Sequence, residues 1–349
     1  MTIHAALALL GAIPDKIAAP ESFLNHWFSN FWIVLVLKVV VVMGFVLTAP
    51  LGVGYMEHKV LAHMQARLGP MEAGRFHGWA QLIADGVKFV QKEDVIPRAA
   101  DPVVFTLAPA VALVPYIAIF VVLPFGHTIW AENLDIGIFY VLAIGAVSVI
   151  GVLMAGWASA NKFALIGALR AAAQLIAYEL PLVLAAVAVV MQAGTLSLVG
   201  IADAQNHFWY ILTQPVMAGI FLVASLAELT RPPFDMPIAD SEIIFGAYTE
   251  YTGLKFAFFL LAEYAGIVAL SGIASVLFLG GYQPLPGLAA IPGPLWMAAK
   301  VGGLSFSVVW FRATFPRLRE DQLQRFSWVV LIPLALADIM ITAVLKVAV

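Results

Sequence analysis

Apolar residues occupy most of the chain in long runs, and short polar segments separate these runs. A helix needs about 20 apolar residues to cross about 30 Å of hydrocarbon, so each run can be compared with that length. Glycine and proline mark several ends, as in Gly69-Pro70 and Pro292-Gly293-Pro294. The pattern predicts an all-α polytopic membrane protein with a single membrane domain, 1–349, and eight transmembrane helices near residues 30–56, 102–125, 136–160, 166–192, 209–229, 254–280, 293–312 and 327–347.

Basic residues are distributed unevenly between the two sides of these predicted spans. Fourteen of the 18 Lys and Arg residues lie in or beside the loops that follow spans one, three, five and seven. The loops after spans two, four and six contain none. Because cytoplasmic loops carry the excess of Lys and Arg, both termini are predicted on the outer side, and the long first, fifth and seventh loops in the cytoplasm.

The first cytoplasmic loop, residues 57–101, has a helical pattern of its own. Phe76, Trp79, Ile83 and Val87 recur at intervals of three or four residues, with polar side chains on the complementary stripe. This spacing predicts an amphipathic interfacial helix. Two roles are compatible with it: a surface anchor, or one wall of a ligand entrance.

Composition excludes several classes of protein. Hydrophobic residues make up 62% of the chain and charged residues 11%, whereas about a quarter of a soluble domain is charged. The net charge of −3 is nearly balanced and says little about partners. Without cysteine the chain can form neither a disulfide nor a thiolate-bound iron–sulfur cluster. The seven histidines lie in termini, loops or span edges, which argues against intramembrane haem, and no nucleotide-binding motif is present.

The segment from Ala227 to Glu263 contains an unusual concentration of acids. An ionisable group at the centre of a membrane helix costs about 2.5–3.5 kcal/mol on insertion scales, so a cluster predicts protons, ions or a polar ligand. Arg231-Pro232-Pro233 must end the fifth span, because consecutive prolines remove backbone donors. A solvated acidic loop is the alternative, but the neighbouring side chains are mostly apolar. The acids are Glu228, Asp235, Asp240, Glu242, Glu250 and Glu263, with Arg231 and Lys255 the only bases among them.

Another acid, Glu179, lies inside the fourth apolar span. Arg170, Gln174 and Tyr178 form a polar stripe that leads to it from the cytoplasmic end, and Pro181 follows it. A polar stripe can serve only to join helices. A carboxylate deep in an apolar run is better explained by function. Three further ionisable groups inside spans need partners that the sequence does not identify: Lys38, Lys300 and Asp338.

Six blocks of sequence resemble one known family. They are YMEHKVLAHMQARLGP, LIADGVKFVQKED, GWASANKFALIGALRAAAQLIAYELPL, AELTRPPFDMPIADSE, TEYTGLKFAFFLLAEY and RATFPRLREDQL. In order and spacing they are similar to the H subunit of bacterial NADH:quinone oxidoreductase, which is subunit 1 of mitochondrial complex I. The resemblance runs from about Val53 to the C-terminus.

The resemblance implies a place in a multi-subunit enzyme of the prokaryotic plasma membrane. Such a subunit lies between hydrophilic quinone-junction subunits and antiporter-like membrane subunits. It lines most of a quinone tunnel, for ubiquinone or menaquinone as substrate, and no flavin, haem or iron–sulfur cluster is expected in this chain. Matched motifs imply quinone-tunnel roles for Glu57, Arg67, Asp85, Arg231 and Phe259. They imply a proton path through Glu179, Glu228, Asp235, Asp240, Glu242, Glu250 and Glu263, and docking of the hydrophilic arm or shaping of the tunnel by Arg312, Arg317 and Arg319.

The sequence departs from the family pattern at three places. His58 stands where the family usually has arginine, and Met71-Glu72 follows Gly69-Pro70 where the family has asparagine. Ile238 replaces an acid found in the fifth loop of many members. These changes leave the quinone type open. They also leave open a relative fed by another donor, such as ferredoxin or F420, because the donor site lies on other subunits.

Two other classes compete with this interpretation. A stand-alone proton-coupled transporter also uses intramembrane carboxylates near broken helices, but such folds often contain two related halves, and the RPPFD block occurs once. A passive membrane anchor for a soluble redox module would leave the buried acids unexplained.

Overall fold

The computed structural model describes residues 30–206, 208–284 and 291–348, together with all side chains in those ranges except those of 240, 241 and 348. Every regular element in these ranges is helical, which confirms the predicted all-α class. The helices are α4 (Phe31–Met64), α5 (Gln81–Gln91), α6 (Pro102–Val122), α7 (Gly137–Gly145), α8 (Val147–Ala158), α9 (Lys162–Ala193), α10 (Leu198–Asp203), α11 (Tyr210–Thr213), α12 (Pro215–Glu228), η1 (Met236–Ile238), α13 (Asp240–Ile243), η2 (Gly246–Tyr248), α14 (Gly253–Phe278), α15 (Gly293–Thr314), α16 (Glu320–Phe326), the π-helical η3 (Ser327–Leu331) and α17 (Ile332–Ala348).

Seven stretches in the described part of the chain are long and apolar enough to cross a membrane. They coincide with the predicted spans other than the fifth; α7 with α8 forms one of them, and α16 through α17 another. The predicted fifth span contains the shorter helix α12, whose 14 residues extend about 21 Å at 1.5 Å per residue. The eighth crossing and the outward orientation of the termini remain predictions, and residues 1–29 lie outside the described ranges.

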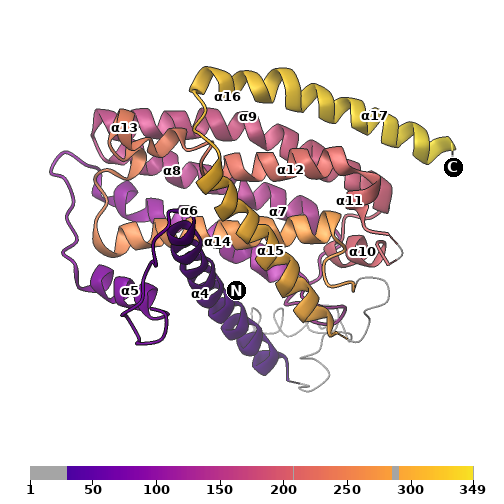
Figure 1. The fold of residues 1–349 in the computed structure, drawn as a ribbon, viewed down its shortest axis with the longest axis horizontal. Coiled ribbons are helices and arrows are strands. Elements are labelled where there is room, and N and C mark those ends of the chain that lie inside the picture. Colours follow the sequence, from indigo (N-terminus) through magenta and orange to yellow (C-terminus); the bar gives the residue numbers. More distant parts are fainter. Residues whose placement is uncertain (1–29, 207, 285–290, 349) are drawn as a thin grey trace, which may run out of the picture.

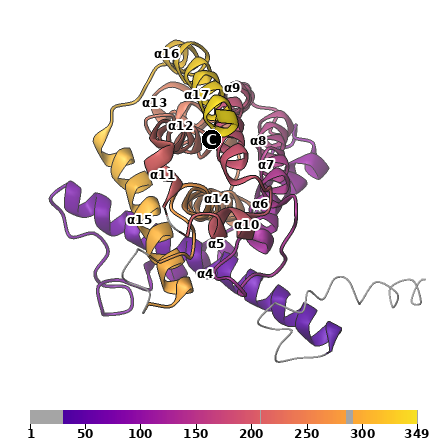
Figure 2. The same ribbon diagram turned by 90° about the vertical axis from the view of Figure 1, so that its right-hand side faces the viewer.

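Helices α9, α12 and α14 run side by side in a bundle along the long axis of the molecule, and α4 and α15 cross this bundle obliquely (Figure 1). The close packing of α8 depends on glycines, which have no side chain. A Cβ on Gly151 of α8 would lie 2.5 Å from the backbone nitrogen of Ala112 on α6. One on Gly156 would lie 2.5 Å from the carbonyl oxygen of Ala164 on α9. The glycines therefore let α8 sit between α6 and α9. Helices α4 and α5 lie on one side of this bundle, and α16 and α17 on the opposite side (Figure 2).

The interfacial helix is shorter than the sequence pattern predicts. Helix α5 begins at Gln81, so Phe76 and Trp79 precede it in a series of turns. Arg75 and His77 have positive φ angles there, which a right-handed helix cannot contain. Helix α5 packs against α4 and α14, and its apolar residues Ile83 and Val87 remain exposed. Its position at a membrane interface remains a prediction.

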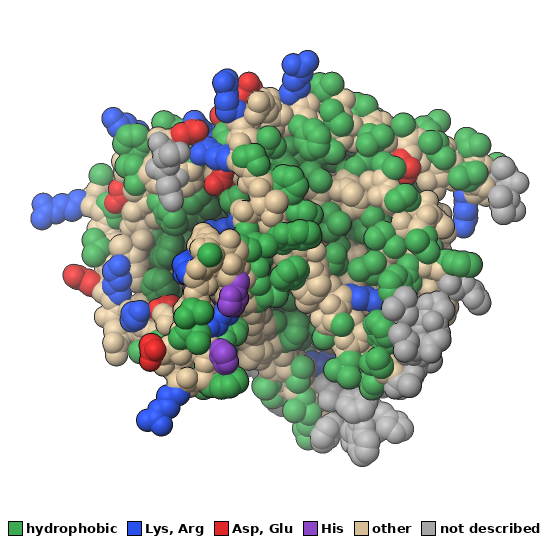
Figure 3. Space-filling view, in the orientation of Figure 1, with side chains coloured by type: hydrophobic (Ala, Val, Ile, Leu, Met, Phe, Trp, Pro, Cys, Tyr) green, Lys and Arg blue, Asp and Glu red, His purple; other side chains and the backbone are tan. Residues whose placement is uncertain are grey.

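The fifth loop folds back onto the bundle as short helical turns. Helix α12 ends at Glu228, as predicted from the proline pair that follows. Elements η1, α13 and η2 then pack against α9. A Cβ on Gly167 of α9 would lie 2.6 Å from the Cα of Gly246, so the loop backbone approaches the helix closely. Lys, Arg, Asp and Glu side chains gather over this end of the molecule, and apolar side chains cover most of the remaining visible face (Figure 3).

Candidate functional site

A buried network of charges joins four separate segments of the chain. Arg231, just after α12, donates from Nη1 to Glu57 Oε2 of α4 at 2.6 Å. Its Nε lies 2.6 Å from Glu263 Oε1 of α14. Glu57 also pairs through Oε1 with Arg312 of α15. The side chains of Arg231 and Glu57 are only 2% and 3% exposed, so the centre of this network is shielded from solvent.

Two ion pairs and a cation–π contact hold Arg231 in its position. Burial by itself would lower the pKa of Arg231, but the carboxylates of Glu263 and Glu57 outweigh that effect and raise the pKa above its ordinary value. Its guanidinium carbon also lies 5.0 Å from the centre of the Tyr264 ring, within cation–π distance. The arginine therefore stays charged, and its two carboxylate partners compensate its charge.

Two small cavities connect three of the acids. The first, of about 40 Å³, is lined by Glu263, Glu228, Tyr116 and Phe259 among others. The second, of about 20 Å³, is lined by Glu228, Glu179 and Tyr116 among others. Glu228 and Tyr116 line both cavities. A cavity of about 10–15 Å³ can hold one water molecule that has polar partners. The arrangement can therefore place water between successive carboxylates.

Other predicted acids form a separate network nearer the surface. Arg170 Nη1 lies 2.6 Å from Glu242 Oε2, and Arg317 Nη2 lies 3.2 Å from Glu242 Oε1. Arg317 Nε in turn lies 3.1 Å from Asp235 Oδ1. The hydrogen bond from Arg170 holds the pKa of Glu242 below its ordinary value, and Arg317 adds to this effect. Arg170 also reaches Glu320 of α16 at 3.6 Å, so the network ties the fifth loop to α9 and α16.

Several predicted site residues lie outside both networks. Glu250 accepts a hydrogen bond from Asn161 Nδ2 at 2.6 Å. Asp85 bonds to Lys88 and Gln81 within α5, and Arg67 is exposed and bonded to Gln65. Arg319 is also exposed and pairs with Asp321, whereas Phe259 is buried between the rings of Tyr248 and Tyr251. The side chain of Asp240 lies outside the described residues.

Sequence analysis missed residues that complete these sites. Tyr116 and Ser148 line the first cavity, but neither belongs to a recognisable motif. The one signal for Tyr116 is a phenol in the middle of an otherwise apolar span. Glu320 and Asn161 meet their partners only through the tertiary fold. Within the predicted polar stripe, Gln174 has a structural role, because its Nε2 bonds the carbonyl oxygens of Ala227 and Phe234, at 2.7 Å each.

The three isolated ionisable groups have different surroundings. Lys38 lies 3.7 Å from Glu132, in the loop after α6. Lys300 donates to the carbonyl oxygens of Leu279, Gly281 and Gln283 at 2.6–2.7 Å, beyond the end of α14. Asp338 pairs with neither lysine, and among the described residues its buried Oδ2 has no hydrogen-bond partner.

Comparison with known proteins determines the family. The model of a family described as NADH dehydrogenase matches residues 37–343. The chain belongs to this NADH dehydrogenase family. It is 44% identical over 334 residues to the H subunit of NADH-quinone oxidoreductase from Bacillus mycoides (strain KBAB4), with 96% of this chain and 98% of the relative covered. The H subunits from Bacillus thuringiensis subsp. konkukian (strain 97-27) and Bacillus cereus (strain AH187) match to the same extent.

Membership of the NADH dehydrogenase family confirms the resemblance drawn from the six sequence blocks. With its several long apolar helices, the chain is a complex I membrane subunit of the H type.

Proposed function

We propose that this chain forms most of the quinone-binding tunnel of a proton-pumping NADH:quinone oxidoreductase, and the acidic path that couples quinone reduction to proton translocation. The observation that supports this proposal most strongly is the continuity of its charges. Glu57, Arg231 and Glu263 form one buried network, and Glu263 shares a cavity with Glu228. Residues assigned by resemblance to the tunnel are thus in direct contact with residues assigned to the proton path.

The helices and arginines around Glu57 support a quinone tunnel at this position. Helices α4, α5 and α14 pack against one another, and α5 presents an apolar exposed face beside them. A quinone with an apolar tail enters from the bilayer between these helices. Arg231 and Arg312, both bound to Glu57, supply positive charge at the inner end of that route. Arg67 and Asp85 flank its entrance from the loop and from α5.

The chemistry of quinone reduction supplies a driving force. Reduction of a quinone to a quinol takes up electrons, which other subunits deliver, and an equal number of protons. Negative charge on the partly reduced quinone, next to Glu57, competes with the carboxylates for Arg231 and Arg312. Unit charges 4 Å apart interact by about 4 kcal/mol at an effective dielectric constant of 20, so this competition weakens the hold of Arg231 on Glu263. Glu263 is the acid at which the proposed proton path begins.

The proton path continues from Glu263 through the two cavities. Water in the first cavity links Glu263 to Glu228, and water in the second links Glu228 to Glu179. Asp235 and Glu242 act earlier, at the surface network, where Arg170 and Arg317 hold them. Asp240 and Glu250 belong to the same proposed path through the sequence resemblance.

The proposal includes a position in the membrane and in the complex. The chain crosses the prokaryotic plasma membrane eight times, with both termini outside and the fifth loop in the cytoplasm. Arg312, Arg317 and Arg319 meet the hydrophilic quinone-junction subunits, and antiporter-like membrane subunits receive the coupled charge movement. The donor is NADH, as the names of the Bacillus relatives state for those proteins. These names do not favour a stand-alone transporter.

Replacement of Glu228 by glutamine tests the proposed function. Glutamine keeps the shape of the side chain but can neither bind nor release a proton. In the assembled complex, NADH-driven quinone reduction should fall by about a hundredfold or more, because a positioned proton-transfer group typically contributes about 10²–10⁴-fold. Electron transfer from NADH to a soluble artificial acceptor should stay unchanged, because that acceptor takes electrons before the quinone site.

A second carboxylate provides the control. Asp338 lies in α17 and lines neither cavity, so Asp338→Asn should leave quinone reduction within about twofold of the wild type. Normal quinone reduction in Glu228→Gln would refute the proposed path. Loss of both electron-transfer activities would indicate failed assembly, and Glu228→Asp, which restores a carboxylate, would then be measured for recovery of quinone reduction.

A further inference from the structure

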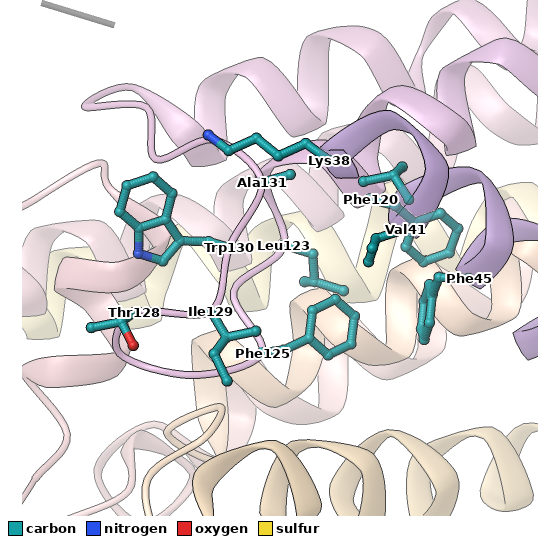
Figure 4. Close-up of a pocket in the computed structure, with 11 residues that line it drawn as sticks. Lys38, Val41, Phe45, Phe120, Leu123, Phe125, Thr128, Ile129, Trp130 and Ala131 are labelled. Carbon is teal, nitrogen blue, oxygen red and sulfur yellow. The ribbon is translucent and has the colours of Figure 1, made fainter. Parts of the chain in front are cut away.

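A large apolar cavity lies at the end of the molecule remote from the fifth loop. Its volume is about 360 Å³, and it is formed by one face of α4 together with the end of α6 and the loop that follows it. Phe45, Phe120 and Phe125 gather at one end of it (Figure 4). The ring of Phe45 meets those of Phe120 and Phe125 edge-on, at centroid distances of 5.2 and 4.9 Å. This end of the cavity therefore suits only an apolar occupant.

The opposite end of the cavity is lined by Lys38, whose ion-pair partner Glu132 lies just beyond the lining residues. Lys38 and Trp130 lie there, away from the phenylalanines (Figure 4). Lys38 Nζ is 3.7 Å from Glu132 Oε2 and 5.7 Å from the centre of the Trp130 ring. Both charged side chains retain access to the exterior, at 14% and 34% exposure. The pair is therefore open to further ligands of either sign.

The cavity lies along a helix face that is open to lipid. Val39, Val40 and Val41 of α4 are 53–61% exposed, in a helix with the composition of a membrane span. From Lys38 to Phe45 the helix rises about 10 Å, at 1.5 Å per residue. That rise is about two thirds of one leaflet, since the hydrocarbon core is about 30 Å thick. The segment of α4 from Lys38 to Phe45 is thus shorter than the hydrocarbon thickness of one leaflet.

We propose that this cavity binds one acyl chain of a phospholipid whose head group carries both a phosphate and an amine. The acyl chain lies along Val41 and Val42 and ends among the phenylalanines. The phosphate binds the ammonium group of Lys38, and the amine binds the carboxylate of Glu132. Trp130 fits the level of the head group, where amphipathic rings concentrate. This lipid site does not depend on the proposed quinone chemistry.

Charge complementarity distinguishes this occupant from others. A quinone tail would fill the apolar end, but its uncharged head offers no partner for either Lys38 or Glu132. A purely anionic lipid matches Lys38 and is repelled by Glu132. An apolar helix of another subunit leaves both charges covered and without new partners, which is costly. A head group with a phosphate and a primary ammonium matches both side chains, because its N–H groups can donate to Glu132, whereas the quaternary ammonium of phosphatidylcholine has no N–H to donate.

Photo-crosslinking within the whole complex tests the site. A benzophenone side chain is placed at Val41, which lines the cavity, or at Val40, which is equally exposed on the same helix but does not line it. Each complex is put into vesicles with equal amounts of phosphatidylethanolamine, phosphatidylglycerol and phosphatidylcholine. Adducts at position 41 should be enriched in phosphatidylethanolamine by about fivefold, the scale of one partly exposed charge pair. Adducts at position 40 should match the vesicle composition.

Two further variants assign the head-group contacts. Glu132→Gln should abolish the enrichment of phosphatidylethanolamine over phosphatidylglycerol while position 41 still captures phospholipid. Lys38→Gln should reduce phospholipid capture at position 41 without affecting position 40. Identical adducts at positions 40 and 41 would overturn the proposal. So would capture of a quinone, or of another subunit, at position 41. Because the readout is adduct mass, these outcomes are independent of quinone reduction.

Discussion

Arg231 and Glu57 are 174 residues apart in the chain, yet Arg231 Nη1 lies 2.6 Å from Glu57 Oε2 in the interior of the protein. Arg231 lies immediately after α12, and Glu57 lies within α4. The same guanidinium also contacts Glu263, so one arginine bridges a carboxylate near the proposed tunnel and a carboxylate at the start of the cavity chain. We expect Arg231 to transmit a change of charge at Glu57 to Glu263.

Replacing Arg231 with methionine should destabilise the protein and abolish quinone reduction. The change leaves Glu57 and Glu263 without their shared cation, and breaking a buried ion pair costs about 3–5 kcal/mol. Thermal unfolding of the purified complex and NADH:quinone activity would measure both effects. Lys346→Met is the control: exposed Lys346 has no part in the proposed tunnel or proton path and donates to the carbonyl oxygen of Gln192, so its loss should cost about 1 kcal/mol.

The coupling energy between Glu57 and Arg231 can be measured separately from the total loss of stability. With Glu57→Gln and Arg231→Gln combined, the double variant should be less destabilised than the sum of the two single variants, because it contains no uncompensated charge. The measurement is a double-mutant cycle of unfolding free energies. Strict additivity would mean that the 2.6 Å contact has no energetic consequence.

Acid should weaken the surface network around Glu242. The hydrogen bond from Arg170 depresses the pKa of Glu242 in the folded protein, so the unfolded state binds the proton more tightly. The stabilisation from this group is therefore complete above its ordinary pKa of about 4.5 and is lost as pH falls through the lower folded value. The melting-temperature difference between the wild type and Glu242→Gln should stay constant from about pH 6 to 8 and shrink below about pH 4.5.

This pH test has an internal check. Glu242 is 44% exposed, so solvent screens the interaction and the absolute effect should be small. Arg170→Gln should reproduce the behaviour of Glu242→Gln, because both remove the same contact. A melting-temperature difference that grows on acidification would contradict the assigned pairing.

Lys300 should contribute to stability through its backbone contacts. Its ammonium group satisfies three carbonyl oxygens beyond the end of α14 and lies 4.4 Å from the centre of the Trp209 ring. Lys300→Met leaves these acceptors without their donor, and an unsatisfied buried group costs about 1–3 kcal/mol. Lys346→Met is the control, because exposed Lys346 donates to a single carbonyl, that of Gln192. Equal melting temperatures for the two variants would contradict this role.

Sequence alone predicted the long helices well, because hydrophobic length is a local property. The boundaries of α6 and α14 agree with the predicted spans within a few residues. The turns at Arg75 and His77 were missed, because the apolar spacing of Phe76 and Trp79 continues through residues whose φ angles are positive. The short length of α12 was missed because residues on both sides of Gln214 are apolar, although the helix starts only at Pro215.

The grouping of the acids could not be predicted in the same way. Glu228 and Glu250 occur in one acidic segment, yet Glu228 lines both cavities and Glu250 binds Asn161. Pairing depends on which helices become neighbours, and Arg231 meets residues from α4 and α14 only after the bundle forms. Sequence resemblance identified Glu57 and Glu263 in separate roles; their common partner is a property of the fold.

Glu179 offers the sharpest test of whether sheltered carboxylates couple quinone reduction to proton movement. Complex containing Glu179→Gln would be reconstituted into vesicles, and quinone reduction and proton translocation would be recorded in the same sample. Both should fall together by about a hundredfold or more, while electron transfer to a soluble acceptor continues. Proton translocation at the wild-type ratio to quinone reduction, with both at wild-type rates, would contradict this expectation.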